Sequence, residues 1–425
     1  MKKITITAVV VIAVGAVAFA YTRMPVPTAP KKPAEVVTTD ATGATREGVQ
    51  GVVNANTIFA LHAYSELGKS SGNVFFSPYS ISEALAMVYE GARGTTAEEI
   101  QSVLHFPTDA GTRRSAFAAM HNQLNPVNAP YKLSIANALW AQQDYKLLDE
   151  YKTTVHRYYG GSATTVDFMH AAEQARSTIN SWVFQQTNGK IPELFPSGSL
   201  DTSTRLALTN AVYFKGQWFR PFSKWSTRDE DFRTRSTKTH KAPMMRITDD
   251  ESIFPYTETP NAQILEMPYT GNHLSMLIAL PKNNDLSSLE HSLSPETIRS
   301  WHDALRGRPV HVTLPKFTFK QNQSLNSLLG TLGIHNAFSP NADFSGMDGT
   351  HNLSIGTAVH QAVVDVNEEG TEAAAATGFG VTATASAPSQ EPIAEFRADH
   401  PFIFFIQEST NGNILFMGRV ENPGA

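Results

Sequence analysis

Residues 368–377 read EEGTEAAAAT, and FRADHPFIFFI follows at 396–406. An acidic pair, one glycine and a run of four alanines therefore stand ahead of a small-residue segment and a hydrophobic strand. The run AVHQAVVDVNEE, which begins at Ala358, is strand-like, and further strands are predicted at 402–406 and 413–420. The chain is predicted to display a long segment between strands.

Side chains in this segment alternate as they would in a strand. One face of a period-two strand would carry small residues first and apolar residues after them. A central strand tolerates no proline. Pro388 is the first proline after Gly370, so the segment could form a central strand as far as Ala387. This pattern suits a segment that is exposed in one state and enters a packed sheet in another. A flexible linker or a short alanine-rich helix is the alternative interpretation. The first face comprises Thr371, Ala373, Ala375, Thr377, Phe379, Val381 and Ala383.

The N-terminus predicts export. Residues 1–20 combine two lysines, an apolar run and an Ala-x-Ala end, which is typical of a bacterial signal peptide cleaved after Ala20. An uncleaved membrane anchor is the alternative, because the apolar run is near the lower limit for a spanning helix. In both cases the body of the protein faces outward, in the periplasm or outside the cell. Residues 21–48 are rich in Pro, Thr and Ala and are predicted to form a disordered tether.

The composition excludes several classes of site. Cysteine is absent, which excludes disulfides, thiolate metal sites and a cysteine nucleophile. None of the 14 histidines lies within helical spacing of another, and no G-x-S-x-G, phosphate-loop or H-E-x-x-H motif occurs. We therefore expect no enzymatic activity, no cofactor and no metal. The net charge of −5 gives no indication of a nucleic-acid site, and the pair Arg113–Arg114 is predicted to lie on the solvated surface.

Strands outnumber helices in the second half of the chain, and helices precede them, so the fold class is predicted to be α+β. Helical spacing runs over 179–195 and stops at Asn188–Gly189. The polar stretch STRDEDF at 226–232 is predicted to be a turn. Strands are predicted at 133–140, 206–222, 242–246, 264–269, 274–282 and 311–319.

Several of these motifs, in this order, resemble the serpin family. NVFFSPYSISEALAM at 73–87 and GARGTTAEEI at 91–100 look like the family's N-terminal signature, and EEGTEAAAAT looks like its hinge. The resemblance covers almost all of 50–422. It implies one serpin domain over 49–425, with three β-sheets, about eight or nine helices and an exposed reactive loop at about 368–395. It also implies a monomer.

The resemblance assigns roles to particular residues. A polar cluster beneath the sheet that must open, the shutter cluster, is implied at Ser77, Ser80, Asn210 and His360. Its hydrogen bonds can be broken and remade when strands separate. Two plainer interpretations coexist with this role: Ser77 as a helix cap followed by Pro78, and His360 as a satisfied core histidine.

The hinge and the top of the sheet, called the breach, are assigned in the same way. Glu368 is implied to anchor the hinge through an ion pair whose partner the sequence does not name, with a solvated acid as the alternative. Trp218 is implied to lie at the breach, and plain core packing is its alternative role. The hinge comprises Glu368, Glu369, Gly370, Thr371, Glu372, Ala373, Ala374, Ala375 and Ala376.

Counting the family's usual fourteen residues from Thr371 puts the reactive bond at Thr384–Ala385. Counting back from Phe396 moves it toward Ser386 or Ala387. These residues are small and uncharged, which favours an elastase-like or subtilisin-like target. The implied function is inhibition of serine proteases as a suicide substrate, with the protease as a covalent partner. A non-inhibitory serpin acting as a binding or carrier module is the alternative.

Overall fold

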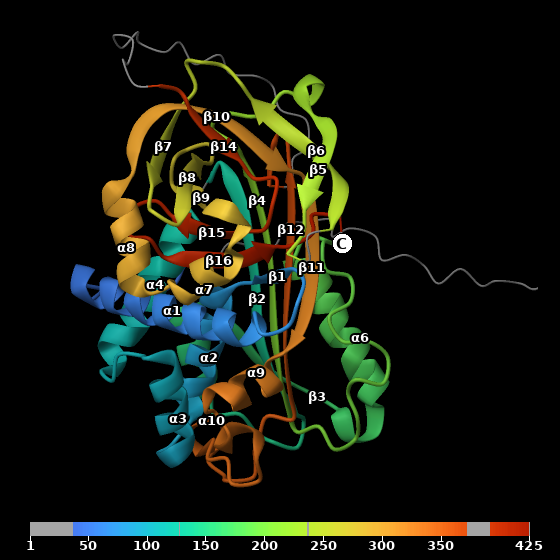
Figure 1. The fold of residues 1–425 in the computed structure, drawn as a ribbon. Helices are drawn as coiled ribbons and strands as arrows, with labels where there is room; N and C mark the ends of the chain where they lie inside the picture. Colours follow the sequence, from blue (N-terminus) through green and yellow to red (C-terminus); the bar gives the residue numbers. More distant parts are fainter. Residues whose placement is uncertain (1–36, 127, 236–237, 372–391, 425) are drawn as a thin grey trace, which may run out of the picture.

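The computed structural model describes residues 37–126, 128–235, 238–371 and 392–424, and these fold into helices and β-sheets (Figure 1). The α-helices are α1 (Arg46–Leu67), α2 (Pro78–Gly91), α3 (Gly94–Leu104), α4 (Ala110–Leu124), α5 (Asp149–Tyr159), α6 (Phe168–Gln186), α7 (Leu286–His291), α8 (Pro295–Ala304), α9 (Leu325–Leu332) and α10 (Ser345–Asp348). Short 3-10 turns lie at η1 (Lys224–Ser226), η2 (Lys282–Asn284) and η3 (Asn336–Phe338).

The strands of the first half are β1 (Val74–Phe76), β2 (Tyr131–Gln142), β3 (Ser162–Val166), β4 (Leu206–Gln217), β5 (Arg228–Arg233), β6 (Thr239–Ile247), β7 (Ile253–Glu258) and β8 (Ala262–Pro268). Those of the second half are β9 (Leu274–Pro281), β10 (Arg306–Pro315), β11 (Phe317–Ser324), β12 (Thr357–Asn367), β13 (Gly370–Thr371), β14 (Ala394–Arg397), β15 (Phe402–Glu408) and β16 (Ile414–Val420). The predicted α+β class is confirmed, with ten α-helices among the described residues against the eight or nine expected.

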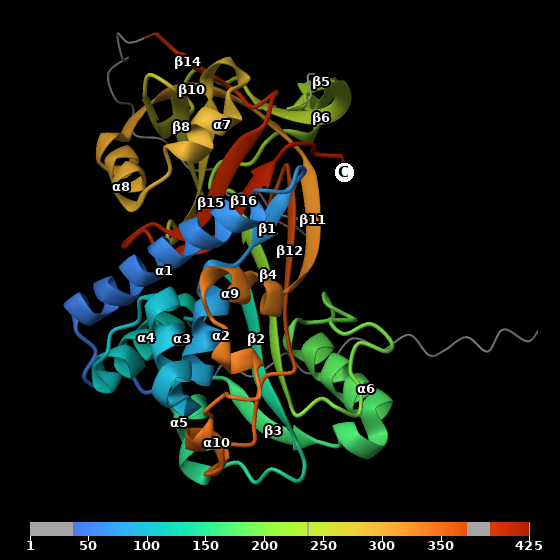
Figure 2. The same cartoon turned by 60° about the horizontal axis from the view of Figure 1, so that its bottom comes forward.

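A six-stranded sheet in the order β11-β12-β13-β4-β2-β3 forms the middle layer. Along β4, Leu208 and Val212 face the main core beside α2, while Ala207 and Ala211 pack in a second cluster beneath α6. The sheet is thus covered on both faces, with α6 on one side and α2 on the other (Figures 1 and 2). This explains why its central strands are apolar almost throughout.

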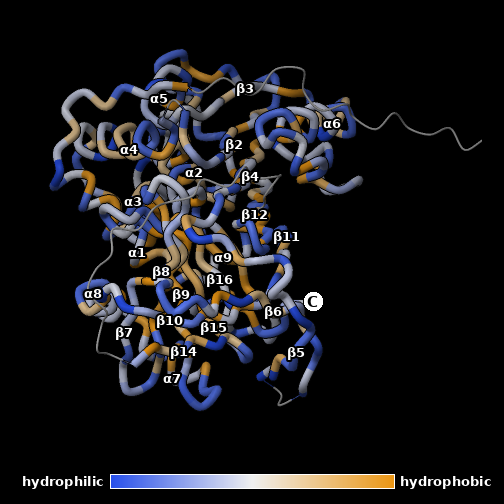
Figure 3. Tube along the Cα trace, turned by 90° about the horizontal axis from the view of Figure 1, so that it is seen from above, coloured by the Kyte–Doolittle hydropathy of each residue, from blue (hydrophilic) through white to orange (hydrophobic). Residues whose placement is uncertain are grey.

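The other ten strands form a network that divides at β10. The first half of β10 pairs with β7, and its second half pairs with β6 and β14. One part is the run β1-β16-β15-β9-β8-β7, and the other is β14-β10-β6-β5, so three sheets are present as expected. Aromatic rings pack between the layers: the ring centroids of Phe214 in the middle sheet and Phe416 of β16 are 5.9 Å apart. Figure 3 shows hydrophobic positions along the packed strands and hydrophilic ones along the outer loops.

The predicted tether needs correction over 37–48. Helix α1 already begins at Arg46, with Thr45 capping it through a bond from the Gly48 amide. The Thr39 hydroxyl donates to the Ala118 carbonyl at 2.8 Å, and Thr39 is buried. Specific hydrogen bonds to neighbouring helices therefore order a stretch whose composition alone indicated disorder. Residues 21–36 lie outside the described part of the chain.

Two charged stretches also differ from expectation. STRDEDF is not a turn but mostly strand β5, which lies at the edge of its sheet, where charged side chains are favoured. Arg113 is buried rather than solvated, because Arg113 and Arg114 both bind the carboxylate of Glu90. Pairing with a buried acid offsets the free-energy cost of removing the arginine from water.

Candidate functional site

The middle sheet contains a seam where β4 and β12 run parallel. Residues Thr357–Val363 of β12 pair in register with Ala207–Tyr213 of β4. The outer neighbours, β11 and β2, are antiparallel to β12 and β4. Parallel pairing is slightly less stable per residue than antiparallel pairing, so this seam is a favourable place for the sheet to part.

The start of the predicted hinge is already inside this seam. Strand β13, only Gly370 and Thr371, pairs antiparallel with β12 on one side and with β4 on the other. A Cβ at Gly370 would come within 2.1 Å of the Gly216 carbonyl oxygen, so the position excludes every side chain. Thr371 is completely buried. The hinge therefore enters the sheet at this end through Gly370 and Thr371, where the space between β4 and β12 limits the size of the side chain.

Trp218 takes the position expected at the breach. Its indole nitrogen donates to the Asn367 carbonyl at 3.0 Å, and its ring stacks on Tyr269 with centroids 4.6 Å apart. The Tyr269 hydroxyl in turn bonds the Thr371 hydroxyl at 2.7 Å. Trp218 thus both packs in the core and holds the hinge, which unites the two roles considered from the sequence.

The structure supplies the partner that the sequence could not name for Glu368. Its carboxylate lies 2.9 Å from Lys316 Nζ and accepts a hydrogen bond of 2.8 Å from the Thr227 hydroxyl. Burial opposes ionisation of Glu368, yet these bonds outweigh it and hold its pKa below the ordinary value. The neighbouring Glu369 pairs with Lys224. Both hinge acids are therefore anchored, and the solvated alternative for Glu368 is excluded.

All four residues of the shutter cluster come together, fully buried, at the seam. Ser77 caps α2 by accepting a bond from the Ser80 amide at 3.2 Å, with Pro78 in the first turn. The Ser77 backbone N–H donates to His360 Nε2 at 3.0 Å. Asn210 donates to the Ser80 hydroxyl at 2.6 Å. The capping role and the cluster role of Ser77 are thus both present.

His360 and Asn210 face each other directly across the seam and are hydrogen bonded through Nδ1 and Oδ1. Burial lowers the pKa of His360 to about 3, so the imidazole is neutral. Because Nε2 accepts from the Ser77 amide, the single ring proton is on Nδ1, which donates to Asn210. This bond must break when β4 and β12 separate, whereas the Ser77–His360 bond does not cross the seam.

The sequence interpretation missed two members of this network. Asn137 of β2 lies opposite Asn210 and accepts a bond from its amide nitrogen. The Asn137 amide then donates to the carboxylate of Glu83, on α2, at 2.9 Å. Both are buried. One signal was available: an asparagine inside the apolar run LSIANALW, and a glutamate one turn after Ser80, are polar residues at positions predicted to be internal.

The rest of the predicted site lies outside the described residues. This applies to the hinge from Glu372 to Ala376, and to the reactive-bond candidates Thr384, Ala385, Ser386 and Ala387. Their roles stay predictions.

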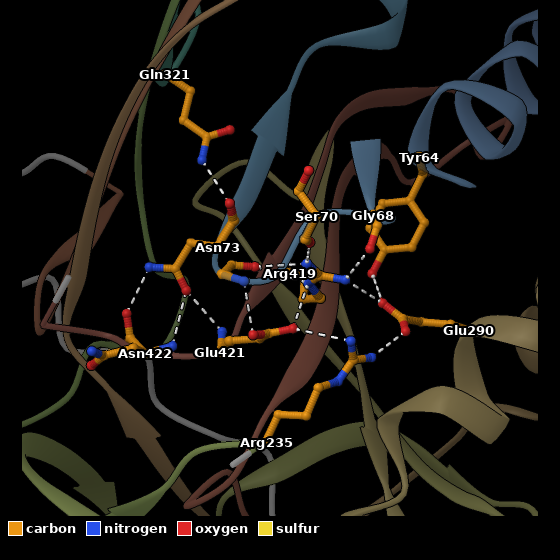
Figure 4. Close-up of polar contacts among 11 residues, drawn as sticks. Tyr64, Gly68, Ser70, Asn73, Arg235, Glu290, Gln321, Arg419, Glu421 and Asn422 are labelled. Carbon is orange, nitrogen blue, oxygen red and sulfur yellow. Dashed lines mark hydrogen bonds and ion pairs between the residues drawn. The ribbon is translucent and has the colours of Figure 1, made fainter. Parts of the chain in front are cut away.

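A second polar cluster fastens the last strand of the chain (Figure 4). The guanidinium of Arg419 on β16 is fully buried and donates to the carbonyl oxygens of Gly68, Ser70 and Gly72 and to the Glu290 carboxylate. All five of its N–H donors are thereby used. The cluster ties β16, which follows the reactive loop, to the turn between α1 and β1.

Among the described residues, no group of three or more His, Asp or Glu side chains is arranged to hold a metal ion. None of the helices in the described ranges is long and apolar enough to cross a membrane.

Comparison with known proteins gives a consistent result. The family model described as Serpin (serine protease inhibitor) matches residues 54–423. Leukocyte elastase inhibitor A of Rattus norvegicus is 43% identical over 380 residues, which cover 87% of this chain and 99% of the relative. Uncleaved ovalbumin superposes with a TM-score of 0.78 at 33% identity, over 88% of this chain and all of that one. Human thyroxine-binding globulin complexed with thyroxine superposes with a TM-score of 0.80 at 31% identity, over 88% of this chain and 99% of that one.

Proposed function

Because this chain belongs to the serpin family, we propose that it inhibits serine proteases as a suicide substrate. The family model is described as a serine protease inhibitor and the matched relatives as elastase inhibitors, not as catalysts, and the chain is not an enzyme. In the proposed reaction the protease serine attacks the reactive bond and forms an acyl-enzyme. The freed loop then inserts between β4 and β12 and carries the protease with it.

The observation that carries this proposal is the place of β13 in the seam. Gly370 and Thr371 already run antiparallel to both β4 and β12. Further insertion would replace one parallel pairing by two antiparallel ones, which are the more stable kind. Continuing the register for six residues would bring Thr377 between Asn210 and His360, on the face that carries Thr371. Its hydroxyl would then meet the two groups whose mutual bond had been broken.

The free energy available is sufficient to drive the change. An inserted strand makes on the order of ten backbone hydrogen bonds, each worth about 0.5–1.5 kcal/mol net. Burial of Phe379 and Val381 would add to this. The total is comparable to the roughly 5–15 kcal/mol that stabilises an ordinary domain. The form with an exposed loop is therefore a kinetic trap.

The target we propose is a protease with small-residue specificity. The reactive bond is assigned to Thr384–Ala385, with Ser386 and Ala387 as the alternative register. No lysine or arginine occurs between Thr371 and Ser389, so a trypsin-like pocket would lack a partner for its acid. The similarity to leukocyte elastase inhibitor A supports an elastase-like enzyme, and a subtilisin-like cleft is equally compatible.

A carrier or binding module is the second candidate, and the likeness to thyroxine-binding globulin favours it. Against it stands the alanine run Ala373–Ala376, because small residues are what insertion requires.

We also propose that the protein is exported, on the strength of residues 1–20. Mass analysis of the mature N-terminus distinguishes cleavage after Ala20 from an uncleaved anchor.

Incubation with elastase or subtilisin, followed by a denaturing gel, tests the function. We expect a covalent complex with these enzymes and none with trypsin. Denaturing conditions are needed because the fragment after the cut contains β14, β15 and β16, which stay paired with β10, β9 and β1. Its first residue should be Ala385, Ser386 or Ala387. Cleavage without a complex would instead favour the carrier module.

A further inference from the structure

An ion pair adjoins the shutter cluster on the side away from the seam. Glu83 of α2 and His121 of α4 are 3.3 Å apart between Oε1 and Nδ1, with side chains 1% and 12% exposed. Glu83 also accepts bonds from Asn137 at 2.9 Å and from the Tyr79 hydroxyl at 3.1 Å. A buried carboxylate therefore terminates the polar network that begins at His360.

The donors in this network all point toward Glu83. His360 Nδ1 donates to Asn210, Asn210 donates to Asn137, and Asn137 donates to the carboxylate. Hydrogen bonds arranged head to tail polarise one another, and a charged acceptor at the end strengthens the series. The charge on Glu83 consequently fixes the amide of Asn210 with its oxygen toward His360.

His121 is itself held on two further sides. Val37 and His121 line the same surface pocket, and the Val37 backbone is among the groups that raise the pKa of His121. Its ring lies against Gly160, where a Cβ would come within 2.7 Å of Cε1, so no side chain fits there. The segment that carries Val37 is fixed to α4, because the Thr39 hydroxyl donates to Ala118 and its amide donates to Asn122 at 2.9 Å.

The same segment is anchored to α5. Asp40 binds the guanidinium of Arg157, and its amide donates to the Arg157 carbonyl at 2.8 Å. Residues 37–40 therefore form a strap across α4 and α5 that covers His121. The family match begins only at residue 54, so the strap lies outside it.

We propose that Glu83 and His121 are positioning residues that keep the seam closed, and that the strap at residues 37–40 holds His121 in place. The proposal rests on the proposed loop insertion, since it concerns how readily β4 and β12 separate. Protonated His121 stabilises the Glu83 carboxylate, and the carboxylate orients Asn137 and Asn210 for the bond to His360.

The pH dependence has a definite sign. Burial disfavours the charge on His121, but the interactions with Glu83 and with the Val37 backbone outweigh it and raise the pKa of His121. The pair's stabilisation is fully present below the ordinary histidine pKa of about 6.5 and is lost as pH rises through the raised value. Tyr79 donates to Glu83, and Tyr131 and Lys132 line the same surface pocket as His121. Burial raises the pKa of both tyrosines and keeps them neutral, and it also raises the pKa of Glu408, which acts on both.

Hydrogen exchange on the full-length protein tests the proposal. We expect the amides of 207–213 and 357–363 to exchange slowly at pH 6 and faster at pH 9, after correction for intrinsic rates. In H121Q and E83Q they should exchange roughly tenfold faster at pH 6, the ratio that corresponds to one hydrogen bond to a charged group. In both variants, the difference in corrected exchange rate between pH 6 and pH 9 should disappear. H156Q and E150Q, on the exposed face of α5, are the matched controls.

T39A tests the strap without altering either charge, and it should shift exchange in the same direction by a smaller factor. T38A, at an exposed position of the strap, should behave as wild type. Wild-type exchange and pH profiles in H121Q, E83Q and T39A would overturn the proposal. Failure of the wild type to form a protease complex would refute the proposed inhibition, whereas the exchange comparison would still decide the positioning role.

Discussion

His360 and Asn210 are joined by a hydrogen bond that crosses the parallel seam between β12 and β4. Neither group has any access to solvent. On the face of the sheet toward α2, a side-chain hydrogen bond therefore lies where the sheet must open, with the apolar Leu208, Val212, Ala358 and Ala362 on either side of it. A hydrogen bond can be broken and then remade with a new partner when the strands separate, whereas an interlocked apolar cluster would resist their separation.

The neutral state of His360 predicts sensitivity to acid. Its pKa is about 3 in the folded protein and about 6.5 when unfolded, so the unfolded chain binds more protons between these values. Stability should therefore fall as pH drops from 6.5 toward 3, by about 2 kcal/mol at pH 5. Urea midpoints measured across this range should show the decline in wild type. His360→Gln should lack that part of it, and an identical pH profile in the variant would contradict the assignment.

Thr371→Arg should turn the inhibitor into a substrate. Thr371 is fully buried and bonded to Tyr269, so an arginine there must be desolvated or must leave the sheet. On the proposed function, cleavage by elastase should persist while the covalent complex disappears from the gel. Thr371→Ser, which keeps the hydroxyl, is the control and should retain the complex. Equal complex yield from the arginine variant would show that this face does not insert.

Arg419→Lys should destabilise the protein by about 2–3 kcal/mol. Lysine has three donors in place of five, so buried carbonyl oxygens of the turn at 68–72 lose their partners. Arg235 binds Glu290 and Glu421 in the same cluster but is 36% exposed, and Arg235→Lys should change stability by less than about 1 kcal/mol. Chemical denaturation of the two variants side by side is the measurement. Similar losses in both would show that the buried guanidinium has no special role.

Cleavage of the loop should raise the thermal midpoint by tens of degrees, because an added central strand contributes free energy comparable to the stability of a whole domain. Calorimetry of intact protein and of protein cut near Thr384 by a non-target protease provides the comparison. Coincident melting would mean a serpin fold without the stressed-to-relaxed change, and would favour the carrier module.

Local patterns were sufficient to predict much of the fold. The Ser77–Pro78 helix start, the strand predicted at 206–222 and the family resemblance of 73–87 all depend on residues close together in the chain. The observed strand, β4, covers Leu206–Gln217 of that range. The four shutter residues and Trp218 are assigned from the resemblance. The structure joins the four shutter residues in one hydrogen-bonded cluster and places Trp218 apart from them, bonded to Asn367. The charged edge strand β5 was misread as a turn, since its position at the edge of a sheet is not a local property.

The class of the fold, the apolar strands and the small-residue composition of the loop follow from the amino-acid sequence alone, because hydrophobic periodicity and side-chain size act between near neighbours. Folding in three dimensions was needed to reveal that Lys316 anchors Glu368, that Asn137 and Glu83 extend the shutter cluster, and that residues 37–40 pack on α4. Each of these contacts joins residues far apart in the chain or in different elements. A charged or polar side chain takes its partner from the fold, and nothing in its own neighbourhood specifies which partner that will be.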